Sequence, residues 1–250
     1  MPAYRFSTAG RWFYVGMAAF LVATAAAGFL PTSLAKIQAV QAGQRPPLPP
    51  ILHLHAVAMG CWLLLLLAQA TLAAIGRGQF HRSLGLASFV VAPTVLVALI
   101  LLVRHEYQLG VQFGFKDDVS NGLLFKIKSI VLFAVFYVWA IYERKRDSDT
   151  HKRLMLLTTI AVIDAALGRM VGYGWLPSLP QGAFVGYDST HFYQLLWLTP
   201  ALAYDTIARG RPHKVYIFGI ISLLFFMVMT HVLWGSAWWL NAAPRLMGVS

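Results

Sequence analysis

Histidines inside apolar segments are the residues of this chain best suited to chemistry. His53 and His55 follow Pro49 and Pro50 at the start of an apolar run, and the run is about as long as the roughly 20 residues that cross a bilayer. The prolines suit a first helical turn, because their missing N–H groups would be unpaired there anyway. Imidazole binds metal ions and haem iron and carries protons, and membrane helices rarely hold ionisable groups without a reason. We therefore expect a polar site near one membrane face.

Helical periodicity sorts these residues by face. His55 and Met59 are four residues apart and share one face of their helix, whereas His53 lies roughly 200° away from His55 around a helix of 3.6 residues per turn. In a later apolar run, His191, Gln194 and Asp205 fall nearly on one stripe. We expect this stripe to face the inside of a helical bundle.

Depth in the membrane brings further residues to the same level. His231 lies about 26 Å along its helix from Lys214, which we place at the cytoplasmic end. In a hydrocarbon layer about 30 Å thick, His231 therefore falls in the outer half. Arg169 falls in the same outer half, and Asp164 lies nearer the middle. Each such Asp or Arg costs roughly 2.5–3.5 kcal/mol on insertion scales, so we expect each to be paired.

Three kinds of metal site fit these residues. A b-type haem needs two imidazoles at similar depth, and His55 with His191 or His231 would supply them. A copper site would combine imidazole with thioether sulfur, as in His55 with Met59 facing His231. A zinc or iron site would use three histidines, with Asp164 as a further ligand, and leave one position open for water.

These sites predict a redox function, either electron transfer or oxidation of a small or lipid-soluble substrate. His55, His191 and His231, with His53 as a fourth ligand, would hold the metal or haem, and Asp164 and Arg169 would tune charge or guide protons. One alternative is a zinc-dependent membrane hydrolase in which Asp164 takes the proton from bound water. Another is a cofactor-free, proton-coupled transporter or sensor that uses Asp164, Arg169 and Asp205. Purely structural roles, as interfacial histidines, core methionines and an ion pair, fit the same residues.

Composition supports a membrane environment. The chain has 250 residues, of which 58% are hydrophobic and 12% charged, half the charged fraction of about 25% in soluble domains. Its net charge of +11 comes from Lys and Arg at the ends of apolar runs, where basic residues orient membrane helices, so we exclude nucleic acid as a partner. The single cysteine, Cys61, excludes an internal disulfide and multi-cysteine metal motifs.

Seven apolar runs predict an all-α, single-domain bundle of about seven transmembrane helices over residues 1–250. The runs are about 12–30, 51–75, 84–104, 123–142, 154–176, 191–208 and 215–240. Of the 20 Lys and Arg residues, more fall in the alternate segments that are cytoplasmic when the N-terminus is inside. The positive-inside rule therefore predicts a cytoplasmic N-terminus, an outward-facing histidine cluster, and a long outer loop over 106–121.

Two cytoplasmic junctions resemble each other. One reads Phe80-His81-Arg82-Ser83-Leu84-Gly85 and the other Thr150-His151-Lys152-Arg153-Leu154-Met155. The likeness indicates a weak two-helix repeat, a shared phosphate-holding helix start, or basic anchors that reach lipid headgroups. We expect His81 and His151 to lie outside the main site and to approach headgroups or acidic partners.

These junctions, together with the later Arg169, resemble an uncharacterised group of bacterial polytopic membrane proteins, a family of unknown function. Its pattern is a His near a helix start, then His-Arg-x-Leu-Gly, His-Arg-Arg-x-Met and a later Arg. The resemblance spans about residues 53–170 and departs at Asp164, where an uncharged residue is expected. It implies only a compact helical membrane domain. We separately expect an integral protein of a bacterial inner membrane, with the lipid bilayer and other membrane or redox subunits as partners.

Overall fold

A computed structural model describes residues 8–178 and 188–249 of the chain, and this part of the chain is helical, with no strand. The prediction of an all-α fold is confirmed. The helices are α1 (Thr8–Gln41), α2 (Pro50–Ala74), α3 (Gly78–Gly85), α4 (Ser88–Gln112), α5 (Lys116–Glu143), α6 (Ser148–Ile160), α7 (Asp164–Gly172), α8 (Asp188–Arg209), α9 (Lys214–Leu233) and α10 (Ala237–Met247).

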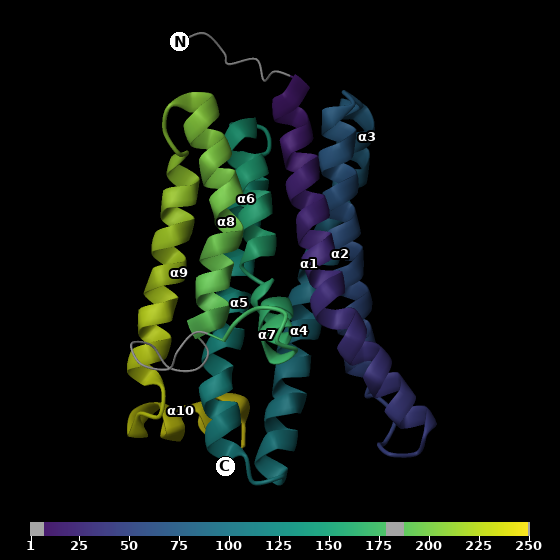
Figure 1. Ribbon diagram of the computed structural model, residues 1–250, viewed down its shortest axis with the longest axis vertical. Coiled ribbons are helices and arrows are strands. Elements are labelled where there is room, and N and C mark those ends of the chain that lie inside the picture. The colour runs from purple at the N-terminus through teal and green to yellow at the C-terminus, as the bar shows by residue number, and fades with distance from the viewer. Residues whose placement is uncertain (1–7, 179–187, 250) are drawn as a thin grey trace.

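Six segments in the described residues are long and apolar enough to cross a membrane, as an integral membrane protein requires. They are Gly10–Gln41, Pro50–Ala74, Gly78–Gln112, Lys116–Glu143, Ser148–Gly172 and Lys214–Leu233. The helix α8 runs beside α9 for most of its length (Figure 1) but is more polar along its sequence.

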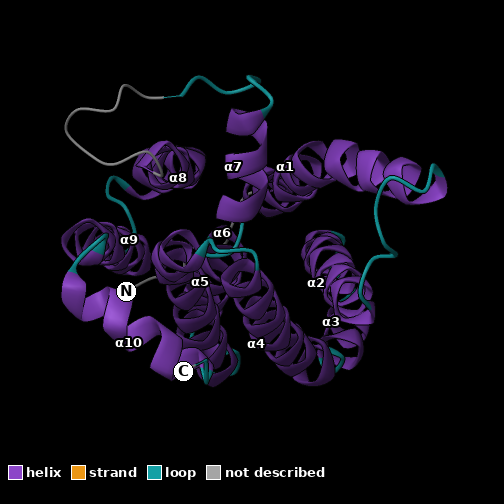
Figure 2. Ribbon diagram, turned by 90° about the horizontal axis from the view of Figure 1, so that it is seen from below, coloured by secondary structure: helices purple, strands orange, loops and turns teal. Residues whose placement is uncertain are grey.

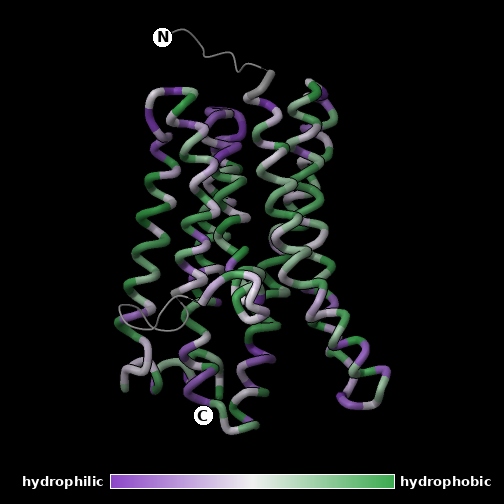
Figure 3. Tube along the Cα trace, in the orientation of Figure 1, coloured by the Kyte–Doolittle hydropathy of each residue, from purple (hydrophilic) through white to green (hydrophobic). Residues whose placement is uncertain are grey.

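The long axis of the bundle has two chemically different ends. At the upper end of Figure 1, the connections 75–77, 144–147 and 210–213 carry arginine and lysine, and we call this the basic end. At the opposite end, α4 turns into α5 and α10 lies across the bundle (Figures 1 and 2). Hydrophilic residues gather toward these ends and the stretch between them is mainly hydrophobic (Figure 3), as a bilayer requires.

Two helix boundaries differ from the sequence prediction. The expected loop over 106–121 is mostly helical, because α4 continues to Gln112 and α5 begins at Lys116. Gly114, with φ of 85°, makes the turn between them, and Asp117 and Asp118 stand in the first turn of α5, where carboxylates favour a helix. The run over 154–176 is broken between α6 and α7, although neither Gly nor Pro occurs at positions 161–163.

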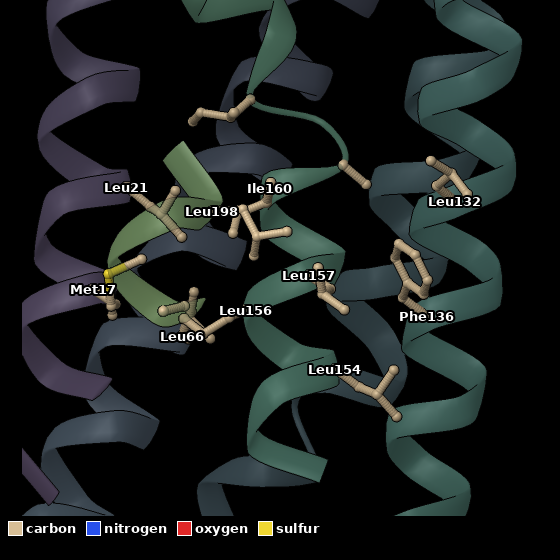
Figure 4. Close-up of a cluster of buried hydrophobic side chains, with 14 of the residues drawn as sticks. Met17, Leu21, Leu66, Leu132, Phe136, Leu154, Leu156, Leu157, Ile160 and Leu198 are labelled. Atoms are coloured by element: carbon tan, nitrogen blue, oxygen red, sulfur yellow. The ribbon is translucent and has the colours of Figure 1, made fainter. Parts of the chain in front are cut away.

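The centre of the bundle is a layer of buried apolar side chains between α1, α6 and α8. Five side chains form this apolar layer, each at most 2% exposed: Leu21, Leu156, Leu157, Ile160 and Leu198 (Figure 4). Nearby, the indole N–H of Trp62 on α2 donates to Thr159 Oγ1 at 3.1 Å, which ties α2 to α6.

Close contact between α1 and α7 fixes the broken helix against the bundle. Gly28 lies so near the backbone of Ala166 that an added Cβ would come within 2.5 Å of the Ala166 carbonyl oxygen. Only glycine fits there without displacing α7, and Asp164 begins that helix.

Candidate functional site

Asp164 forms a buried ion pair with a lysine from a different helix. Lys128 Nζ on α5 lies 2.9 Å from Asp164 Oδ2, and the two side chains are 0% and 8% exposed. Ser129, the next residue on α5, donates its hydroxyl to the same oxygen at 3.0 Å. The other carboxylate oxygen accepts the Ala165 N–H in the first turn of α7 at 2.9 Å. The expectation that Asp164 is paired is therefore confirmed, with a partner that lies outside its own helix.

Gln194 on α8 joins this ion pair to the helix break. Its Oε1 accepts from Lys128 Nζ at 2.9 Å, and its amide nitrogen donates to the carbonyl of Ile160, the last residue of α6. A break inside a membrane segment leaves backbone groups without helical partners, and these must be satisfied by neighbouring side chains. Gln194 does so at this break.

His191 lies one turn from Gln194 on α8 and is 2% exposed. Both of its ring nitrogens are buried and have no hydrogen-bond partner among the described residues. Its ring packs against Phe125 with 4.9 Å between centroids, and it interacts electrostatically with both Lys128 and Asp164. We call Lys128, Ser129, Asp164, His191 and Gln194 the outer polar site, where outer means farther along the bundle from the basic end. The predicted inward stripe is confirmed, because His191, Gln194 and Asp205 are all buried.

The other residues expected in one site are separated. His231 is exposed on α9, on the opposite side of the bundle from α2 (Figures 1 and 2). His53 is exposed, and His55 is half-buried with an Nδ1 that has no described partner. Met59 packs against the apolar cluster around Trp62.

Arg169 likewise takes a partner other than Asp164. Its guanidinium donates to the Ala165 carbonyl at 2.6 Å and lies 4.3 Å from the centroid of the Phe29 ring on α1. The ion pair between Asp164 and Arg169 considered from the sequence is therefore not formed, since Lys128 takes the carboxylate.

Metal ligands do not gather in the described residues, which hold no group of three or more His, Cys, Asp or Glu side chains that could bind a metal ion. The three-histidine zinc or iron site therefore has no assembled ligand set in this part of the chain. Lys128 was not among the residues predicted for the site. Its signal was a lysine next to a serine within a continuous apolar run.

A second buried ion pair lies toward the basic end. Arg153 on α6 donates through Nε to Asp205 Oδ2 at 2.8 Å and through Nη2 to Oδ1, and both side chains are 0% exposed. We call Arg153 and Asp205 the inner ion pair. The backbone N–H of His213 also donates to Asp205 Oδ2 at 3.1 Å. Asp205 therefore holds both the middle of α6 and the connection between α8 and α9.

His213 itself caps α9 as a neutral imidazole. Its Nδ1 accepts the Val215 N–H at 3.3 Å. Burial lowers the pKa of His213 to about 4, and the positive charges of Arg153 and Arg209 act in the same direction. At neutral pH the ring is therefore uncharged in the folded protein.

No protein-family model, curated protein or solved structure matches this chain. Its function is therefore inferred from its own residues. The resemblance to the family of unknown function stays a prediction.

Proposed function

We propose that the protein is a proton-coupled membrane transporter whose working site is the outer polar site. The observation that carries this proposal is the Lys128–Asp164 ion pair, buried at a helix break beside the unpartnered imidazole of His191. All three groups can gain or lose a proton. Ionisable residues in membrane segments are costly, and they typically mark ion or proton pathways.

The break between α6 and α7 supports the same function. Discontinuous membrane helices commonly form the substrate and ion sites of transporters, because their exposed backbone groups and helix ends face a ligand. Here the break holds Asp164 at the start of α7, and the Ile160 carbonyl accepts from Gln194 as well as from the Ile163 N–H at 3.4 Å. A proton that neutralises Asp164 would weaken its bond to Lys128 and free both side chains for a ligand.

The apolar layer would act as the barrier of this transporter. It lies between the outer polar site and the inner ion pair along α6 and α7, since Arg153, Ile160 and Asp164 follow one another along the chain. Leucine and isoleucine side chains have no group that can carry a proton, so this layer would interrupt a proton path in this conformation. Transport would then require a second conformation in which α8 moves against α6.

The proposed topology has seven membrane crossings, which are the six apolar segments and α8. It places the basic end on the cytoplasmic side of a bacterial inner membrane. Lys and Arg in the connections at that end favour this orientation. Reporter fusions to each terminus test it. A C-terminus in the cytoplasm together with the N-terminus would contradict the crossing number, and a cytoplasmic C-terminus with an external N-terminus would contradict the orientation.

Redox and zinc-hydrolase functions have less support from the residues. The zinc or iron site would need His55, His191 and His231 together, and the copper site would need His55 with His231, whereas α2 and α9 lie on opposite sides of the bundle. The cofactor-free function needs only contacts within the outer polar site.

Proton flux into liposomes tests the proposal. We would reconstitute the full chain with an internal pH-sensitive dye and impose a membrane potential with potassium and valinomycin. The expected result is internal acidification with the wild type and its loss with Asp164→Asn or Lys128→Met. The matched control is Glu106→Gln with Lys126→Gln, an exposed ion pair of similar length at 3.1 Å. Equal flux from the wild type and Asp164→Asn, or wild-type flux no greater than that of empty liposomes, would overturn the proposal.

A further inference from the structure

A cavity of about 300 Å³ opens at the basic end, where the first turn of α6 meets the end of α8. Its wall is formed by Asp149, Ala208, Arg209 and Arg211. Ligand pockets in proteins have volumes of roughly 300–1,000 Å³, so this cavity has room for a small ligand group. The side chains of Asp149 and Arg209 are each 30% exposed, and a ligand can therefore reach them.

Asp149 is the centre of a cluster of ion pairs beside the cavity. Lys152 Nζ lies 2.7 Å from Asp149 Oδ1, and Arg153 Nη1 lies 4.0 Å from the same oxygen. Arg209 Nη1 lies 3.9 Å from Asp149 Oδ2, which is too long for a hydrogen bond. The Arg209 guanidinium therefore keeps N–H donors for another acceptor.

Positive charge exceeds negative charge around this cavity. The inner ion pair already balances Arg153, so Lys152 and Arg209 share the single carboxylate of Asp149. Arg211 forms no ion pair with any residue that the structure describes. A cavity whose wall holds two guanidinium groups and one shared carboxylate attracts anions.

The cavity lies where the hydrophobic stretch of the bundle gives way to the basic end (Figure 3). Ile207, directly before Ala208 on α8, is 86% exposed, as a side chain in contact with lipid would be. The connection 144–147 adds three basic residues, and its one acid, Asp147, caps α6. Lipid phosphates lie at such a boundary, where they attract basic side chains, and soluble phosphates reach it from the water.

We propose that this cavity binds a phosphate group, which Arg209 and Arg211 hold. The planar guanidinium fork matches two phosphate oxygens, and such charge-assisted bonds are roughly twice as strong as neutral ones. Asp149 holds Arg209 and Lys152 beside the ligand. The phosphate belongs to the headgroup of an anionic lipid or to a soluble compound, and both sources share this chemistry.

The sequence predicted headgroup contact at this end from other residues. It indicated His81 and His151, whose Nδ1 atoms lie 3.2 Å and 2.8 Å from the carbonyls of Gln69 and Ala140. Each imidazole thus turns that nitrogen to the helix that precedes it. The cavity assigns the anion contact to the arginines at the end of α8 instead.

This site goes beyond the proposed transport function and does not depend on it, because it shares no residue with the outer polar site. It lies next to the inner ion pair, since Arg153 Nη1 donates to the Asp149 carbonyl at 2.8 Å. A bound phosphate would therefore be placed where α6 and α8 are held together.

Binding of phosphate probes to the full chain in nonionic detergent tests the proposal. We would titrate inorganic phosphate, anionic dioctanoyl phosphatidylglycerol and zwitterionic dioctanoyl phosphatidylcholine by isothermal titration calorimetry. The expected result is saturable binding of inorganic phosphate or of phosphatidylglycerol, with phosphatidylcholine weaker than either ligand that binds. Tighter binding of phosphatidylglycerol than of inorganic phosphate identifies a lipid headgroup, and the reverse order identifies a soluble phosphate. The proposal is overturned if neither binds, or if only the two lipids bind and do so equally.

Arg209→Gln and Arg211→Gln are the informative variants. Each removes a charged donor, so the affinity for the bound probe should fall roughly 10–100-fold, with unchanged circular dichroism because both residues are exposed. Arg82→Gln is the matched control, at an exposed arginine of α3 on the other side of the bundle (Figures 1 and 2). Wild-type affinity in both Arg209→Gln and Arg211→Gln, or an equal loss in Arg82→Gln, would refute the assignment.

Asp149→Asn provides a readout in the opposite direction. It removes the carboxylate that competes with the ligand for Arg209 and Lys152, so the probe should bind more tightly than it binds the wild type. Unfolding cannot produce such a gain. Folded Asp149→Asn protein, as judged by circular dichroism, that binds no more tightly than the wild type would overturn the proposal.

Discussion

Replacing the members of the Lys128–Asp164 pair singly and together tests the central contact of the outer polar site. At 2.9 Å and an effective dielectric constant of about 20, the attraction between unit charges is about 6 kcal/mol. Desolvation of both groups offsets much of this attraction, so the pair itself adds little stability. Removing one partner leaves the other buried and unpaired, which costs about 3–5 kcal/mol. We therefore expect Lys128→Met and Asp164→Asn each to destabilise the protein by about that amount.

The double variant should recover most of this loss. With both charges removed, the amide oxygen introduced by Asp164→Asn can still accept a hydrogen bond from Ser129 or from the Ala165 N–H, the two donors that Asp164 accepts from. The free energy of unfolding of the double variant should lie within about 2 kcal/mol of the wild type, as seen when buried ion pairs are replaced together. Detergent unfolding followed by tryptophan fluorescence measures all four proteins. The exposed Lys126–Glu106 pair is the control, with an expected effect of at most about 1 kcal/mol. Additive losses in the double variant would refute the reasoning.

Two further predictions concern α1 and the basic end. Gly28→Ala should destabilise the protein by about 1–3 kcal/mol in the same unfolding assay, because the added Cβ meets the Ala166 backbone. Gly16→Ala is the control and should not destabilise the protein, because a Cβ added there has no atom within 4 Å. Equal effects of the two substitutions would contradict the α1–α7 contact. Since His213 has a pKa of about 4 when folded and about 6.5 when unfolded, stability should be full above pH 6.5, fall as the pH drops from 6.5 to 4, and then level off. His213→Asn keeps a cap for α9 and should lose this part of the pH dependence; an unchanged profile in thermal melts would count against it.

Membrane-scale features of this fold are accessible from the sequence. Apolar length predicted α2 nearly to the residue, because Pro49 and Pro50 mark its start and hydrocarbon thickness sets its length. Helical phase predicted that His191, Gln194 and Asp205 face inward, because a polar stripe on a membrane helix avoids lipid.

Contacts between distant segments are not accessible in the same way. Depth placed His55, His191 and His231 at one level, but it carried no information on which side of the bundle each helix stands. The break after Ile160 could not be predicted from a local Gly or Pro, because neither occurs there. A bond that stabilises the break comes from Gln194 on another helix. The pairing of Asp164 with Lys128 depends on how α5 and α7 are placed relative to each other in space, so it follows from the tertiary fold.

The helix α8 couples the two charged regions of the bundle. Gln194 holds it to Lys128 and to the last residue of α6, and Asp205 holds it to Arg153 near the middle of α6. The apolar layer lies between these attachments, so α8 contacts α6 through a polar or ionic bond on either side of a stretch of side-chain packing. A shift of α8 that opened the apolar layer would have to break at least one of these attachments. Protonation of Asp164 would weaken its bond to Lys128, the residue that also binds Gln194, and would leave the inner ion pair unchanged.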